Sequence, residues 1–267
     1  MNGSALSSRQ VSTGYGKTVL VRDLDFDLAQ GDVLNILGPN GVGKTTLLRA
    51  ITGLSNPIAG EVHLMGKALG TMSIRDRAKA IALVSQSENM TFALTVRETV
   101  LTGRASHLGL FERPGPKDEK LAVAMLEEMG VADLIDRELP SLSGGQRQMV
   151  RIARALTQQS QVVVLDEPTS HLDIANQMQV LAAIRRLSTS GKTVIVTTHD
   201  PEHALVCGGQ VLVLSKARPP IFGSASTVLD EQLLEDVFQV PVSRSVTEDG
   251  DILIAPKYRK ILDTYQS

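Results

Sequence analysis

A run of glycines around one lysine is the feature of this sequence that most directly indicates chemistry. Residues 38–45 read Gly-Pro-Asn-Gly-Val-Gly-Lys-Thr, which fits the pattern GxxxxGK[ST] between a predicted strand and a predicted helix. Such a loop turns backbone N–H groups toward phosphate oxygens, and the following helix adds the positive end of its dipole. We therefore predict that a phosphate group is bound by Gly38, Pro39, Asn40, Gly41, Val42, Gly43, Lys44, Thr45 and Thr46.

Two acidic residues, Asp166 and Glu167, directly follow an apolar strand pattern at 162–165. A nucleotide site needs a carboxylate near its metal, so Asp166 and the hydroxyl of Thr45 are expected on the Mg²⁺ side. Glu167 is expected to face the terminal phosphate, where it would polarise an attacking water as a general base. An acidic pair at a strand end is more often merely solvated, but the glycine loop favours the catalytic interpretation.

A second glycine-rich segment, Leu142-Ser143-Gly144-Gly145-Gln146, precedes the acidic strand and opens a helix pattern. The N–H groups at this helix start, together with the helix dipole, would form a second anion site. A serine N-cap explains Ser143 but not the neighbouring glycines and glutamine.

The order of these motifs resembles that of ATP-binding cassette (ABC) proteins, and the resemblance covers nearly the whole chain. It implies an ATPase that uses ATP and Mg²⁺. It also implies roles for four further residues: Tyr15 would stack on adenine, Gln86 would sense Mg²⁺ and the attacking water, His199 would contact the γ-phosphate, and Asp173 would cross a dimer interface. Taken singly, these would be a packing tyrosine, a solvated glutamine, a strand-end histidine and a helix N-cap.

The same resemblance implies partners. The two anion sites are the glycine loop at 38–45 and the glycine-rich segment at 142–146. If they lie on opposite sides of the fold, the segment at 142–146 of one subunit must close on ATP held by the loop of the other. The result is a homodimer with two bound nucleotides. The family arrangement adds two polytopic membrane permease subunits and a periplasmic or surface substrate-binding protein. The chain is then expected at the cytoplasmic face of the inner (cell) membrane, bound peripherally.

The segment from Thr95 to Phe111 is similar to the insertion of importer ATPases for iron chelates, haem, cobalamin and related metal compounds. In that group the segment after Gln86 forms a groove for a short helix of the membrane subunit, and Arg104, His107 and Phe111 would lie near it. An ordinary amphipathic surface remains the alternative for each of them. Molybdate-like oxyanions as cargo, an exporter ATPase and a non-transport ABC ATPase also stay open as alternatives.

The elements that must position these residues alternate between strands and helices. Buried strands are expected at 33–37, 81–85, 162–165, 193–197 and 211–214, with helices at 44–52, 146–158 and 174–187. This alternation predicts an α/β fold with a mostly parallel sheet, as in a P-loop NTPase core. Short strands in 1–32 and 56–70 predict a small antiparallel layer, and 95–141 reads as a helical insertion that includes a helix at 118–129.

For domain organisation we expect an ATP-binding cassette domain over 1–225, with a helical subdomain at about 87–150. Residues 226–267 would extend the same domain, with one helix near 230–238 and a strand pattern at 249–254.

Composition narrows the class of protein. The formal net charge is −2 and aromatic residues make up 3 % of the chain, so neither a basic surface nor base-stacking aromatics favour a nucleic-acid partner. The only cysteine, Cys207, is expected to be a small buried side chain, which fits a reducing compartment. The first residues do not read as a secretory signal, and no apolar run approaches the about 20 residues that span a bilayer.

Overall fold

The computed structural model describes residues 4–16, 18–86, 93–109 and 111–264 of the 267-residue chain. The chain forms two compact units, the first made of Met1–Gly70 with Val196–Ser267 and the second of Thr71–Ile195. Parallel strands alternate with helices in each unit, and antiparallel strands form smaller sheets, which confirms the predicted α/β class. Residues 87–92 and Leu110, which fall in the predicted helical segments, lie outside the described residues.

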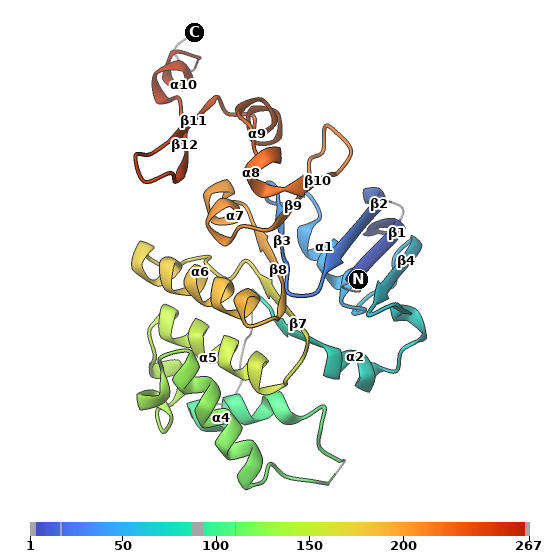
Figure 1. The fold of residues 1–267 in the computed structure, drawn as a ribbon, viewed down its shortest axis with the longest axis vertical. Coiled ribbons are helices and arrows are strands. Elements are labelled where there is room, and N and C mark those ends of the chain that lie inside the picture. The colour runs from blue at the N-terminus through green and yellow to red at the C-terminus, as the bar shows by residue number, and fades with distance from the viewer. Residues whose placement is uncertain (1–3, 17, 87–92, 110, 265–267) are drawn as a thin grey trace. The chain divides into compact units, whose positions relative to one another are not determined.

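The first unit contains an antiparallel sheet with the strand order β2-β1-β4-β5 (Figure 1). Its strands are β1 (Ser4–Tyr15), β2 (Thr18–Ala29), β4 (Ala59–Leu64) and β5 (Lys67–Ala68). The predicted antiparallel layer is therefore confirmed. The prediction of short strands was wrong for β1 and β2, which have 12 residues each and pair with one another along most of their length. In β2, buried and exposed residues alternate almost without a break from Val21 to Leu28.

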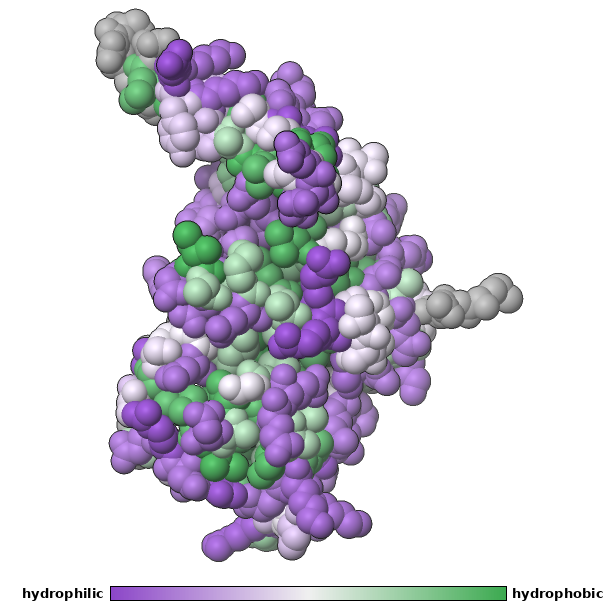
Figure 2. Space-filling view, turned by 60° about the vertical axis from the view of Figure 1, so that its left-hand side comes forward, coloured by the Kyte–Doolittle hydropathy of each residue, from purple (hydrophilic) through white to green (hydrophobic). Residues whose placement is uncertain are grey.

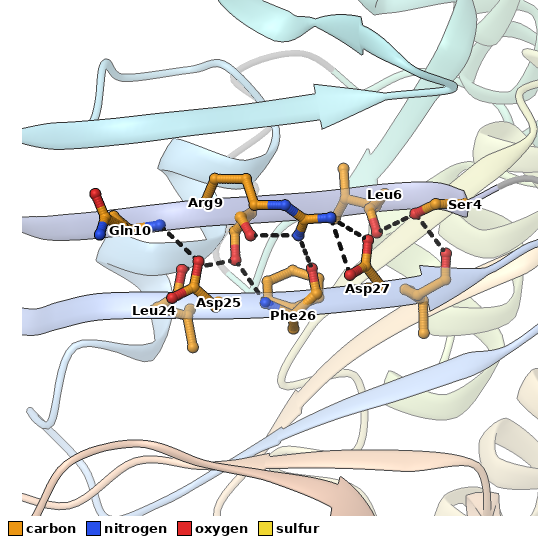
Figure 3. Close-up of polar contacts among 10 residues, drawn as sticks. Ser4, Leu6, Arg9, Gln10, Leu24, Asp25, Phe26 and Asp27 are labelled. Atoms are coloured by element: carbon orange, nitrogen blue, oxygen red, sulfur yellow. Dashed lines mark hydrogen bonds and ion pairs between the residues drawn. The ribbon is translucent and has the colours of Figure 1, made fainter.

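A bulge interrupts β1 at Gln10, which has a φ of 49° at a shift in the register with β2. The Gln10 N–H leaves the ladder and donates to Asp25 at 2.8 Å. Beside it, the Arg9 guanidinium reaches across to both oxygens of Asp27, at 2.8 and 3.0 Å, and to the Phe26 carbonyl (Figure 3). Side-chain bonds thus replace the backbone pairing that the bulge removes.

A parallel sheet forms the other half of the first unit. β3 (Val33–Leu37) pairs in parallel with β9 (Gln210–Val213), and β10 (Ile221–Ser224) pairs antiparallel with β9. All five residues of β3 are buried. Four are apolar, as expected for a parallel strand, and the side-chain amide of the fifth, Asn35, donates to the carbonyl oxygens of Gly208 and Gln210. Helices α1 (Lys44–Ile51) and α7 (Pro201–Cys207) belong to this unit, and the Cys207 side chain is buried, as predicted.

The C-terminal part of the first unit consists of α8 (Ala225–Val228), α9 (Glu231–Phe238), the hairpin of β11 (Val242–Val246) and β12 (Ile252–Pro256), and α10 (Tyr258–Thr264). Its buried side chains belong to one cluster with β9 and α7, through residues Ala204, Val211, Leu233, Leu234, Val237 and Val242. The predicted helix at 230–238 is confirmed. The strand predicted at 249–254 begins three residues later, because Asp249 and Gly250 lie in the turn between β11 and β12.

The second unit contains the parallel strands β6 (Ile81–Val84) and β7 (Val162–Asp166) with helices α2 (Ile74–Ala80), α3 (Val96–Leu101), α4 (Pro116–Glu128), α5 (Gly144–Thr157) and α6 (Ile174–Thr189). β8 (Thr193–Thr198) starts here and ends in the first unit. The predicted apolar face of α5 is confirmed, since Met149, Ile152, Ala153 and Leu156 are all buried. The helix predicted at 118–129 begins earlier, because Pro116 suits the first helical turn.

Polar and charged side chains cover most of the face shown in Figure 2, with small apolar patches between them. Among the described residues, no helix has both the length and the apolar character needed to cross a membrane.

Candidate functional site

The glycine loop at 38–45 lies between β3 and α1 in the first unit, as predicted. Gly41 and Gly43 have φ values of 73° and 114°, in the region that side chains with a Cβ rarely adopt. Gly38 is constrained by space instead, because a Cβ there would lie 2.5 Å from the Leu214 carbonyl oxygen. The loop therefore needs glycine at these three positions to hold its backbone turn.

Lys44 begins α1 and is buried, with 4 % of its surface exposed. Its Nζ donates to the carbonyl oxygens of Gly38 at 2.8 Å and Pro39 at 3.3 Å. The ammonium group is thereby held over its own loop, at the positive end of the helix. Thr45, the next residue, is partly exposed on the first turn of α1.

Tyr15 and His199 belong to the same unit as the loop. Tyr15 ends β1 and is 56 % exposed, so it is not the packing residue that its type alone would suggest. The strand after its turn lies against the loop, because a Cβ on Gly43 would be 3.1 Å from that of Leu20. His199 is exposed directly after Thr198, whose carbonyl oxygen accepts from Gly38 N at 3.3 Å.

The second unit holds the acidic pair at the end of β7. Asp166 is the last residue of that strand and is 6 % exposed. Glu167 leaves the strand with a φ of 46°, a left-handed conformation that costs energy for a residue other than glycine. The chain therefore turns sharply directly after Asp166, at the second residue of the acidic pair.

Two donors bind the same oxygen of Glu167. The Gln86 side-chain amide donates to Oε2 at 3.3 Å, and the Ser170 hydroxyl donates to it at 3.0 Å. Gln86 and Glu167 were predicted to act together, and the structure places them in contact. No role was predicted for Ser170 from the sequence.

A cavity of about 260 Å³ adjoins these groups within the second unit. Predicted site residues from three segments line it, namely Gln86 after β6, Gly144 at the start of α5, and Asp166 with Glu167 after β7. Arg147, Gln148 and Arg151 of α5 also line it, together with His171. The two arginines were not predicted from the sequence. Arg147 follows Gly144 by three residues and Arg151 follows Arg147 by four, so all three lie on one face of the helix, and this spacing could have identified them.

The segment Ser143–Gln146 forms the predicted helix start with a reciprocal capping box. The Ser143 hydroxyl accepts from Gln146 N at 3.2 Å, and the Gln146 side chain accepts from Ser143 N at 3.0 Å. Gly145 packs directly on α6, because a Cβ there would lie 2.0 Å from Oδ1 of Asn176. The glycine is therefore required by packing, in addition to leaving the N–H groups accessible.

Asp173 is the N-cap of α6, which was the alternative interpretation of this residue. Its carboxylate accepts from the backbone N and the side-chain amide of Asn176, both at 2.8 Å. The residue is exposed, so the capping contact leaves the predicted interface role untested.

The three residues predicted near a groove for the membrane subunit differ in burial and in contacts; they are Arg104, His107 and Phe111. The Arg104 guanidinium is largely buried against Asp118, at 2.7 Å. His107 shares a hydrogen bond of 2.8 Å with the Gln158 carbonyl. Phe111 is 94 % exposed, so it alone of the three presents most of its side chain to solvent.

The donor set named for Mg²⁺ is a hydroxyl, a carboxylate and a side-chain amide, all oxygen ligands of the kind that Mg²⁺ prefers. Within the residues that the structure describes, no group of three or more His, Cys, Asp or Glu side chains could hold a metal ion by itself. Each of the three donors thus has the chemistry of a Mg²⁺ ligand.

The sequence matches one protein-family model and is similar to known proteins along most of its length. The sequence model described as ABC transporter matches residues 21–170. The iron(3+)-hydroxamate import ATP-binding protein FhuC of Bacillus subtilis is 36 % identical over 96 % of this chain and 93 % of its own. The molybdate import ATP-binding protein MolC of Haemophilus influenzae is also 36 % identical, over 89 % of each chain.

Two solved structures show the same fold. A chain of an ABC transporter described as of metal-chelate type, in an inward-facing conformation, superposes with a TM-score of 0.86 at 33 % identity, over 98 % of this chain and all of that one. The ATP-binding cassette MJ0796, dimeric and bound to ADP and phosphate, superposes with a TM-score of 0.71 at 26 % identity, over 82 % of this chain and 98 % of that one.

Proposed function

Because this chain belongs to the ABC transporter family and is an ATPase of that family, we propose that it drives the import of a metal-chelate compound of the iron-siderophore, haem or cobalamin class. The observation that carries this proposal is its identity of 36 % over nearly full length with an iron-hydroxamate import ATPase. The similarity to a chain of a metal-chelate type transporter supports the same class of cargo.

We propose that the first unit binds ATP. The backbone N–H groups of the loop at 38–45 and the Lys44 ammonium would hold the β- and γ-phosphates, as the position of Lys44 at the start of α1 supports. The exposed ring of Tyr15 is available to stack on adenine. Thr45 and Asp166, with Gln86, would hold Mg²⁺, which would neutralise phosphate charge.

For hydrolysis we propose that Glu167 accepts the proton of the attacking water. Its carboxylate lies at the cavity of the second unit and is oriented by Gln86. His199 would contact the γ-phosphate and hold the water in line. Proton removal and alignment of the water are the two tasks that a phosphoryl transfer requires of side chains.

We propose further that two copies of the chain act as a homodimer. The capped helix start at Ser143 presents N–H groups that suit a phosphate, and the exposed Asp173 would reach the second copy. The dimeric, ADP-bound cassette among the structural neighbours supports this arrangement. ATP binding would then close the dimer, and hydrolysis would let it open.

The remaining partners follow from the family. Two polytopic permease subunits would receive the closing motion, and a substrate-binding protein would deliver the cargo. The chain would then act at the cytoplasmic face of the membrane. Nothing in its composition favours a nucleic-acid partner.

Variant Glu167→Gln tests the catalytic part of the proposal. It should bind ATP, form a stable dimer in size-exclusion chromatography, and hydrolyse ATP about 10³-fold more slowly or worse. Turnover close to that of the wild type would remove Glu167 from the catalytic role.

The transport part is tested by purifying the tagged chain gently from detergent-solubilised native membranes. Recovery of a polytopic permease at equal stoichiometry, with iron-chelate uptake in reconstituted vesicles, is the expected result. Recovery of ribosomes or DNA-repair proteins would overturn the importer and leave the ATPase intact.

A second cargo is supported by one comparison. The molybdate import protein is as similar in percentage identity as the iron-hydroxamate one, so an oxyanion remains a candidate cargo. Uptake assays with radiolabelled molybdate in the same vesicles would separate the two.

A further inference from the structure

A closed four-residue turn joins Glu167 to Ser170. The Ser170 N–H donates to the Glu167 carbonyl at 3.1 Å, and the Ser170 hydroxyl donates to Glu167 Oε2 at 3.0 Å. Backbone and side chain of the same serine therefore bind the backbone and side chain of the same glutamate. The left-handed φ of 46° at Glu167 belongs to this turn.

We propose that Ser170 is a positioning residue for ATP hydrolysis, which holds the Glu167 carboxylate in the orientation from which it accepts a proton. This inference rests on the proposed role of Glu167 as the base. A carboxylate on a flexible side chain has several rotamers, and a donor three residues away fixes one of them at little cost in entropy.

The serine is better placed for this task than the second donor. Gln86 is exposed and binds the same oxygen at the longer distance of 3.3 Å. Ser170 is partly buried, and the chain after it is held by two further contacts: Leu172 N donates to the Thr169 carbonyl, and the Gln177 amide donates to the Leu172 carbonyl at 3.1 Å. The backbone on both sides of Ser170 is thus held by hydrogen bonds, to Glu167 before it and through Leu172 after it.

The same turn connects the base to the proposed dimer interface. Ser170 is three residues before Asp173, the exposed N-cap of α6. Ser170 is therefore near in sequence to a residue proposed for the interface, and a positioning role has to be separated from an interface role by experiment.

The experiment compares Ser170→Ala, Ser170→Thr and Ser190→Ala in the full chain. Ser190 is the matched control, since its hydroxyl donates to a carbonyl three residues earlier, at 2.8 Å from Leu187 O, in the same unit. Ser170→Ala should lower kcat about ten-fold, as expected for loss of a hydrogen bond to a charged group. The KM of Ser170→Ala for ATP should stay within about two-fold of the wild-type value. Ser170→Thr keeps a hydroxyl and should therefore have most of the wild-type kcat. The control variant Ser190→Ala should match the wild type in both kcat and KM.

Two further variants separate the possible failures. Glu167→Gln, measured in parallel, tests the base: if it turns over ATP like the wild type, the proposed function fails first. If it is inactive while Ser170→Ala keeps the wild-type kcat, only the positioning role is overturned. Loss of ATP-dependent dimerisation in the double variant of Glu167→Gln with Ser170→Ala would also overturn it, because the serine would then act at the interface.

Discussion

At the scale of single residues, Gly145 has no room for a side chain, because Asn176 of α6 packs directly against it. We expect Gly145→Ala to lower ATPase activity at least ten-fold, because its Cβ would lie 2.0 Å from Oδ1 and 2.3 Å from Cγ of Asn176 and would push α6 away. Steady-state hydrolysis measures the loss. Adding Asn176→Ala removes the two nearest atoms and leaves Cβ, at 2.9 Å, so it should recover part of the activity, whereas Asn176→Ala alone should be mild. Full activity of Gly145→Ala would contradict the packing argument.

Residue types predicted chemistry better than they predicted contacts. The glycine loop, Asp166 and Glu167 could be found because each follows an apolar strand in a recognisable order. That Ser170 binds Glu167 depends on a left-handed turn at a non-glycine residue, which no residue type signals. The two arginines at the cavity were missed because charged side chains on a helix usually face solvent.

At the scale of elements, the start of α4 depends on Asp118. Its carboxylate accepts from Gly115 N at 2.9 Å and from Arg104 Nε at 2.7 Å, and these bonds hold the pKa of Asp118 below its ordinary value. A lowered pKa stabilises the fold above the unfolded-state pKa, and this contribution is lost as the pH falls below about 4. We expect Asp118→Asn to cost about 1–2 kcal/mol in urea unfolding at pH 7, and the difference from wild type to shrink as the pH falls below about 4.

The control for this prediction is Asp136→Asn in the same unit. Asp136 pairs with Arg97 at 3.0 Å, but its side chain is 80 % exposed. Solvent screens such a pair, so the variant should change stability little. An equal loss in both variants would show that burial of the Arg104 pair is unimportant.

The periodic pattern of apolar residues in the sequence predicted the long helices and buried strands but not several of the short ones. β3 was predicted with its observed bounds, because four apolar residues, interrupted only by Asn35, lie between turn residues. The strands β10 and β11 and the helices α2, α7 and α8 were missed. Each has at most seven residues, too few for a helical or alternating pattern to repeat, and their positions depend on contacts with distant segments.

At the scale of the whole molecule, Phe111 is the strongest candidate anchor for a membrane partner. The Arg75 guanidinium donates to the carbonyl oxygens of Ser106 and Leu108 a few residues earlier, whereas the Phe111 side chain is 94 % exposed. We expect Phe111→Ser to leave the stability and ATPase rate of the isolated chain unchanged and to lower uptake in vesicles with the permease several-fold. Tyr258→Ser, which alters another exposed ring, is the control; equal effects of both would contradict the prediction.

The C-terminal hairpin stabilises the first unit through three carboxylates. Glu202 of α7 accepts from Ile254 N, and Glu231 and Glu235 of α9 accept from Arg244 N and Val242 N, at 2.6 to 3.1 Å. Removing residues 241–267 would leave these acceptors unpaired and uncover the buried side chains of α9. We expect a lower Tm, corresponding to about 2–4 kcal/mol, with ATP binding retained. An unchanged Tm would show that the hairpin only rests on the surface.

The buried thiol of Cys207 has a practical consequence for experiments on this protein. With 6 % of its surface exposed, and no other cysteine in the chain, the native protein should react slowly with maleimides. A single cysteine introduced at an exposed position such as Asp173 would then be the main site of labelling, with no need to remove a native one. Paired fluorescent or spin labels at that position would report the distance between two copies as nucleotide is added.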